Sequence, residues 1–145
     1  MSGDESPRIV VGIDGSEPSK RALRWAVRQA ELLGGRVDAV AAWEYQDAYV
    51  WLLDTSRVRY DDEANAMLTK TIEEVLGSEP VVEVRPQVRH GDPATMLLEV
   101  ADGAALLVVG NRGHGAFVGA FLGSVSFRCV HHANCPVVVV HGRGD

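Results

Sequence analysis

The stretch Ile9-Val-Val-Gly-Ile-Asp-Gly-Ser16 decides the fold. Its first five residues form a short apolar run rich in β-branched side chains, which is typical of a strand buried on both faces of a parallel sheet. Asp14-Gly15-Ser16 ends this strand, and Ser16 or Ser19 can cap a helix that runs to about Leu33. The chain is therefore expected to begin with a strand followed directly by a helix.

The same alternation of strands and helices continues along the chain. We expect further strands over 37–43, 81–88, 105–109 and 137–140, helices over 60–76, 93–101 and 124–132, and a long loop over 44–59. This order predicts an α/β fold, a Rossmann-like three-layer α/β/α sandwich with a five-stranded, mostly parallel sheet. Ligands of such sheets bind beyond the carboxyl ends of the strands.

The composition is that of a globular protein. The chain has 145 residues, of which 46% are hydrophobic and 23% charged, so we expect a disordered tail over 1–7 and a single domain over 8–145. A net charge of −6 argues against a nucleic-acid surface, but not against a small anion held by backbone amides. Without a signal peptide or a membrane-length apolar run, the expected location is the cytoplasm, with no membrane partner.

The segment from Val109 to Ser126 carries the candidate chemistry. Its glycines lie at 110, 113, 115, 119 and 123, and glycine lets the backbone approach a ligand closely. Gly123 leads into a helix start, whose free N–H groups and positive dipole end suit phosphate. Ser124 and Ser126 add hydroxyl groups in the same turn. This order of strand, glycine loop and serine-rich helix start predicts a nucleotide phosphate site.

Three nucleotide-binding motifs can be tested against this segment. A Walker A loop is absent, because the only lysines are Lys20 and Lys70. A dinucleotide fingerprint fails on both spacing and location. The third pattern fits, since Gly110-x2-Gly113-x9-Gly123-Ser124 matches the G-2x-G-9x-G-[S/T] motif. In this motif the chain resembles the ATP-binding universal stress proteins.

The resemblance covers nearly the whole chain and is weakest over 44–60. It extends to Ile9–Ser16, to His90-Gly-Asp-Pro93, and to Asn134-Cys-Pro-Val-Val-Val-Val140. It implies an ATP-binding protein, with Mg²⁺ beside the nucleotide, that serves as a nucleotide-dependent sensor or signalling protein in the stress response. It also implies a homodimer formed through the last strand, Val137 to Val140.

The resemblance also implies a set of site residues. Asp14 would lie near the ribose, and the end of the second strand would offer backbone groups to the adenine edge. The glycine loop would wrap the ribose and phosphates, and the following helix start would hold the β- and γ-phosphates. The implied nucleotide-binding residues are Gly12, Ile13, Asp14, Ala42, Trp43, Val109, Gly110, Asn111, Arg112, Gly113, Gly115, Gly123, Ser124, Val125 and Ser126. No catalytic or metal-ligating residue is expected.

Several of these residues also have simpler explanations. Asp14 can serve as a plain turn or cap residue. Arg112 can contact phosphate or point into solvent, and His114 is expected to be an exposed loop residue. The aromatic and apolar cluster within 45–53 is expected to fold over the core, with a lid or partner surface as the alternative. Cys129 and Cys135 are expected to pack in the interior rather than bind a metal.

Two other functions remain open from the sequence. One is a slow ATP hydrolase or phosphotransferase, for which Asp14 and Arg112 are the nearby candidates. The other is a structural or chaperone-like dimer whose pocket is empty. Nucleotide bound to the purified protein would separate binding from the structural alternative, and a turnover measurement would test the enzyme.

Overall fold

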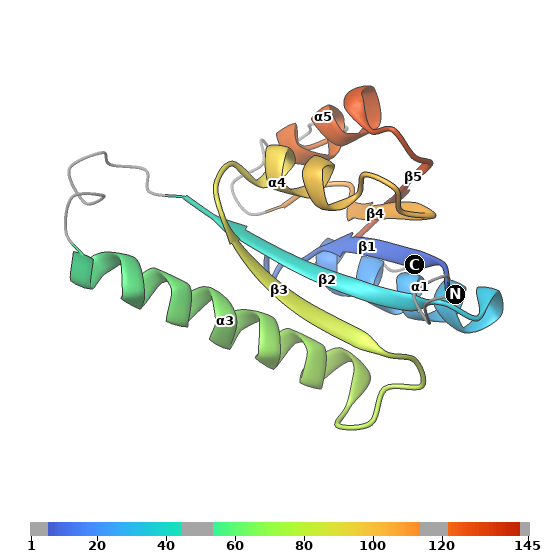
Figure 1. The fold of residues 1–145 in the computed structure, drawn as a ribbon, viewed down its shortest axis with the longest axis horizontal. Coiled ribbons are helices and arrows are strands. Elements are labelled where there is room, and N and C mark those ends of the chain that lie inside the picture. The colour runs from blue at the N-terminus through green and yellow to red at the C-terminus, as the bar shows by residue number, and fades with distance from the viewer. Residues whose placement is uncertain (1–5, 45–53, 114–121, 143–145) are drawn as a thin grey trace.

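A computed structural model gives the fold and describes residues 6–44, 54–113 and 122–142 (Figure 1). The elements are β1 (Arg8–Gly12), α1 (Glu17–Leu33), β2 (Arg36–Trp43), α3 (Asp54–Leu76), β3 (Val84–His90), α4 (Pro93–Val100), β4 (Leu106–Gly110), α5 (Ser124–His132) and β5 (Val137–Val140). The strands form one five-stranded sheet in the order β3-β2-β1-β4-β5, with every neighbouring pair parallel. The predicted Rossmann-like α/β fold is confirmed.

The central strand β1 shows why its sequence is apolar at every position. Ile9 and Val11 point into a core cluster shared with α1 and α3, whereas Val10 points into a second cluster shared with α4 and α5. All three side chains are fully buried. Helices therefore cover both faces of the sheet, as Figure 1 shows, and a strand between two such layers needs apolar side chains on both sides.

Two predicted elements, β3 and α3, have other bounds in the structure. Strand β3 covers Val84–His90 rather than 81–88, because its last residues Arg89 and His90 pair with the end of β2. These two side chains are exposed, so no apolar alternation marked them. Helix α3 begins at Asp54 rather than at 60, within the predicted loop. Figure 1 shows that its start extends beyond the end of β2.

Some predictions concern segments outside the described residues. These are most of the expected disordered tail, residues 1–5, and the aromatic cluster over 45–53. Within the part of the chain that the structure describes, no helix is long and apolar enough to span a lipid bilayer.

Candidate nucleotide-binding site

A cavity of about 300 Å³ lies at the carboxyl edge of β1, β2 and β4. Its walls also include the starts of α4 and α5. The predicted residues that line it are Gly12, Ile13, Asp14, Ala42, Val109, Gly110, Arg112, Gly113, Gly123, Ser124, Val125 and Ser126. The structure thus brings residues from four separate segments of the sequence around one space, at the edge of the sheet where ligands of this fold class bind.

Four further residues line the cavity that sequence reasoning missed: Ser19, Val40, Pro93 and Leu97. Leu97 on α4 packs so close to β1 that a Cβ on Gly12 would lie 2.8 Å from its Cδ1 atom. A signal for Val40 was available, because alternate strand residues share a face and Val40 lies two positions before Ala42. A signal for Pro93 was also available, because the turn before it follows the end of a predicted strand, and strand ends meet at this edge of the sheet.

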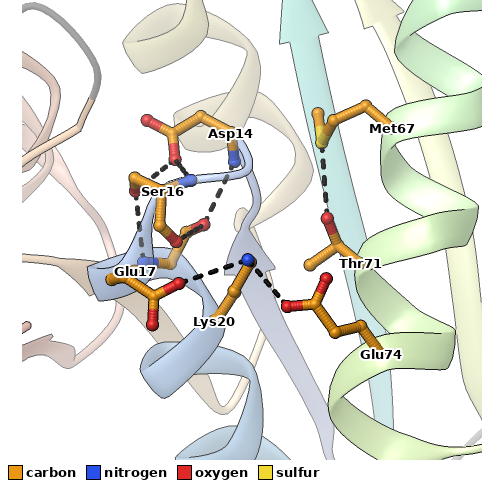
Figure 2. A network of polar contacts seen from close by, with 8 residues as sticks. Asp14, Ser16, Glu17, Lys20, Met67, Thr71 and Glu74 are labelled. Atoms are coloured by element: carbon orange, nitrogen blue, oxygen red, sulfur yellow. Dashed lines mark hydrogen bonds and ion pairs between the residues drawn. The ribbon is translucent and has the colours of Figure 1, made fainter.

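Asp14 combines a turn role, whose hydrogen bonds Figure 2 shows, with a place in the cavity wall. Its Oδ1 atom accepts hydrogen bonds from the backbone N–H of Ser16 at 2.9 Å and from the Ser16 hydroxyl at 2.5 Å. The hydroxyl oxygen of Ser16 in turn accepts from the N–H of Ser19 and caps α1. The second carboxylate oxygen, Oδ2, lies beside Gly113, so close that a Cβ at that position would clash with it. Asp14 is therefore a turn residue that also lines the cavity.

Lys20 lies on the first turn of α1 but outside the cavity wall. Figure 2 shows its ammonium group between Glu17 and Glu74 of α3, at 3.2 Å and 2.8 Å from their carboxylate oxygens. The hydrogen bond to Glu74 raises the pKa of Lys20, and the same bond lowers the pKa of Glu74. Lys20 is therefore tied to α3 and does not supply the lysine of a phosphate-binding loop.

Asn111 is buried and does not line the cavity. Its N–H donates to the Val140 carbonyl at 2.8 Å, and its side-chain Oδ1 accepts from the N–H of Gly142 at 3.2 Å. Its own carbonyl accepts from the N–H of Gly123 at 2.7 Å and from the Ser126 hydroxyl at 3.0 Å. Asn111 therefore holds the ends of β4 and β5 and the start of α5 together.

The start of α5 presents its backbone to the cavity. Gly123 is the N-cap residue and makes no side-chain cap, so the first amides of the helix have no such acceptor. The Ser126 hydroxyl is buried and donates to the carbonyls of Asn111 and Gly123, which leaves it unsuited to phosphate. Ser124 is exposed. Of the two predicted serine hydroxyls, Ser124 is the one placed for a ligand.

Gly110 lines the cavity, but it also has a packing role. A Cβ at this position would lie 2.6 Å from Cβ of Pro18 and 2.8 Å from its carbonyl carbon. Its lack of a side chain is therefore required by contact with α1, whether or not a ligand approaches it. Gly115, together with His114 and Gly119, lies outside the described residues.

Only one of the two predicted residues at the end of β2 faces the cavity. The Trp43 carbonyl accepts from the N–H of Gly91, and its indole nitrogen donates to Asp61 at 2.7 Å. Trp43 is thus turned toward β3 and α3. The Val40 carbonyl instead accepts from the N–H of Ile13 on the β1 side. Because peptide groups alternate along a strand, Ala42 presents its N–H and carbonyl to that side, past the end of β1.

The cavity has two walls of different chemical character. Apolar side chains of Val40, Ala42 and Leu97 form one wall, and glycine backbone with the α5 start forms another. The charged side chains among its described lining residues are Asp14 and Arg112. Such a space can hold an apolar ring together with an anionic group bound by amides.

The cysteines belong to the interior rather than to the cavity. Cys129 is fully buried among apolar side chains of α4, α5 and β4, and Cys135 packs against the same cluster. Burial raises the pKa of the Cys129 thiol to about 11. Among the described residues, no group of three or more His, Cys, Asp or Glu side chains is placed to hold a metal ion.

Comparisons with known sequences identify relatives of the chain. The profile of the universal stress protein family matches residues 5–141. A universal stress protein of Mycolicibacterium smegmatis is 33% identical over 141 residues, which cover 92% of this chain and 48% of the relative. One from Mycobacterium tuberculosis is 33% identical over 147 residues, covering 97% and 49%. The chain spans about half the length of these curated relatives.

Solved structures with the same fold carry the same family name. Universal stress protein UspA from Lactobacillus plantarum has a TM-score of 0.70 at 20% identity, covering 92% of this chain and 97% of its own. A universal stress protein in complex with cAMP has a TM-score of 0.63 at 27% identity, covering 95% and 98%. The Archaeoglobus fulgidus protein in complex with dAMP has a TM-score of 0.57 at 21% identity, covering 93% and 97%. Because the family profile matches almost the full length of the chain, the chain belongs to the universal stress protein family.

Proposed function

We propose that this protein binds ATP and serves in the cytoplasm as a nucleotide-dependent sensor or signalling protein in the stress response. The observation that carries the proposal is the cavity at the strand ends, with its apolar wall and its glycine-lined helix start. A relative that is 27% identical and is in complex with cAMP supports an adenine nucleotide as the ligand.

Each part of ATP has a matching surface in the cavity. The adenine ring fits the base wall, formed by Val40, Ala42 and Leu97, where the Ala42 peptide group meets its polar edge. The ribose lies at Asp14, whose Oδ2 atom faces the glycine loop. The phosphates lie at the phosphate wall, residues 123–125 at the start of α5, where backbone amides bind them.

Mg²⁺ would enter this site together with ATP. Asp14 is the carboxylate among the described lining residues, and its oxygens are assigned to Ser16 and to the ribose. Mg²⁺ would therefore be held by the ATP phosphates and water, and the described residues do not form a separate cation site. When bound, the ion would neutralise phosphate charge, while the chain's own groups position the nucleotide.

We propose binding rather than catalysis. Asp14 and Arg112 both line the cavity, which favours a slow ATP hydrolase as the second candidate. However, Oδ1 of Asp14 is already engaged by Ser16, and amide groups that hold phosphate stabilise ground state and transition state alike. Binding without substantial rate enhancement follows.

We also propose a homodimer through β5. The two edges of the sheet differ. The Val37 N–H donates to the Glu83 carbonyl, so the peptide groups of Glu83 and of alternate residues after it face β2. The residues between them, including Pro86, face the open side of β3, where proline has no N–H to donate to a second strand. Strand β5 has only valines, all half-buried, and the neighbouring α5 exposes Phe127 and Val130. An apolar edge strand of this kind needs a covering partner.

The test is to purify the protein without added nucleotide, denature it, and identify any released ligand by mass spectrometry. Calorimetric titrations of the nucleotide-free protein with ATP, ADP, AMP and cAMP then rank the ligands. We expect an adenine nucleotide to be released and ATP to bind most tightly. Failure of all four ligands to bind at millimolar concentration would contradict the proposal.

A further inference from the structure

A polar cluster of Asp92, Thr95 and Arg128 joins the start of α4 to the middle of α5. Oδ2 of Asp92 caps α4 by accepting from the N–H of Thr95 at 3.0 Å and from its hydroxyl at 2.8 Å. The same oxygen accepts from Nη1 of Arg128 on α5 at 2.5 Å, while Nη2 of Arg128 donates to the Thr95 hydroxyl at 3.2 Å. Because the guanidinium is planar, two contacts fix its direction as well as its distance.

The cluster lies directly behind two walls of the cavity. Asp92 immediately precedes Pro93, which lines the cavity on the α4 side together with Leu97 of the base wall. Arg128 lies one helical turn after Ser124 of the phosphate wall. Neither Asp92 nor Arg128 lines the cavity itself. Their bond therefore connects the two walls from outside.

The charges in this cluster compensate each other. Burial alone would raise the pKa of Asp92, but the hydrogen bonds from Thr95 and Arg128 outweigh it and keep the pKa below its usual value. Asp92 is therefore ionised at neutral pH and matches the charge of Arg128. An arginine neutralised in this way, outside the cavity wall, is placed to orient a helix and not to bind phosphate directly.

We propose that Asp92 and Arg128 are a positioning pair, which sets the separation between the base wall and the phosphate wall. This inference rests on the proposed nucleotide function. A ligand that contacts both walls at once depends on their separation, whereas a ligand that contacts only the base wall and Asp14 does not. ATP is of the first kind and adenosine of the second.

The experiment compares calorimetric affinities for ATP with Mg²⁺ and for adenosine in the wild type, Arg128→Gln, Asp92→Asn and Arg128→Lys. Asparagine keeps the acceptor that caps α4. We expect Arg128→Gln and Asp92→Asn each to lower ATP affinity about fivefold, the upper end for a partly exposed ion pair, and to leave adenosine affinity unchanged. Arg128→Lys, which keeps the charge without the fork, is expected to fall between wild type and Arg128→Gln.

A matched control is Arg85→Gln. Arg85 lies on β3, away from the cavity, and is exposed to the same extent as Arg128, at 46% of its side chain; it pairs with Glu83, which immediately precedes β3. Arg85→Gln removes the same positive charge as Arg128→Gln. Because the lost charge lies away from the cavity, ATP affinity should stay at the wild-type value. Thermal melting of every variant confirms that binding is measured on folded protein.

The outcomes separate the possible explanations. If Asp92→Asn tightens ATP binding while Arg128→Gln weakens it, only net charge matters and the pair does not position the walls. Unchanged ATP affinity in both variants, or equal losses for ATP and adenosine, also overturns the proposal. Wild-type protein that binds neither ligand overturns the proposed function itself, and with it the positioning role.

Discussion

Replacing Asp14 tests the ribose contact, because that contact predicts the sign of the change in ATP affinity. Asp14→Asn keeps an acceptor for the two hydrogen bonds from Ser16, so the turn and the α1 cap should persist. It replaces Oδ2, the oxygen beside Gly113, with an amide group that donates. If ribose hydroxyls donate to this oxygen, ATP binding should lose about 1.5–3 kcal/mol, the value of a hydrogen bond to a charged acceptor, or roughly 10- to 150-fold in affinity.

Electrostatics alone predicts the opposite sign. A carboxylate near the phosphates repels them, so its neutralisation without loss of a ribose contact should tighten ATP binding. Calorimetry with ATP, 2′-deoxy-ATP and 3′-deoxy-ATP distinguishes the two cases and identifies the hydroxyl, because the analogue that lacks it should lose less. Asp14→Ala serves as a comparison, since it also removes the bonds to Ser16 and should lower the free energy of unfolding by about 1 kcal/mol. Tighter or unchanged ATP binding in Asp14→Asn would refute the ribose role.

Four further experiments test other parts of the molecule. Gly123→Asp should abolish ATP binding in calorimetry, because a carboxylate would enter the phosphate wall; wild-type affinity in that variant would place the site elsewhere. Val138→Asp should convert a dimer to a monomer in sedimentation, whereas Val81→Asp, at an exposed position outside β5, should not. Single-turnover hydrolysis of ATP should be far below the roughly 1–10³ s⁻¹ of typical enzymes, and a rate near one per second that falls in Arg112→Ala would favour an enzyme instead. Because the Cys129 thiol is buried and its pKa is about 11, alkylation at pH 8 should be slow until the protein unfolds; mass spectrometry showing rapid labelling of native Cys129 would contradict this.

Much of the fold could be predicted because its signals are local. The apolar run over Ile9–Ile13 reads as a buried strand from its own residues, and Asp92 before Pro93 marks a helix start in the same way. The glycine and serine spacing over 110–124 likewise identifies a loop between a strand and a helix. Each of these features depends only on residues that are neighbours in the sequence, so the sequence of one chain is enough to predict it.

The parts that could not be predicted depend on tertiary contacts. Whether Trp43 or Ala42 faces the cavity follows from which strand lies on each side of β2, and the sequence does not state the strand order. Leu97 enters the cavity wall because α4 packs across β1, far from it in sequence. Asn111 belongs to a loop motif, yet its groups bond to β5 and α5 and not to a ligand-facing surface.

The position of β1 at the centre of the sheet has a consequence for how the protein assembles. Val10 pairs on one side with Asp38, which follows it closely in the sequence, and on the other with Leu107, which is synthesised much later. Non-local pairings of this kind require a large loop to close before they stabilise anything, and they slow folding. Until β4 docks, the earliest strand keeps one apolar edge unpaired and open to aggregation, and the cavity lacks its glycine loop. The cavity is therefore incomplete until β4 has paired with β1, so a chain in which this pairing is missing should not bind through it.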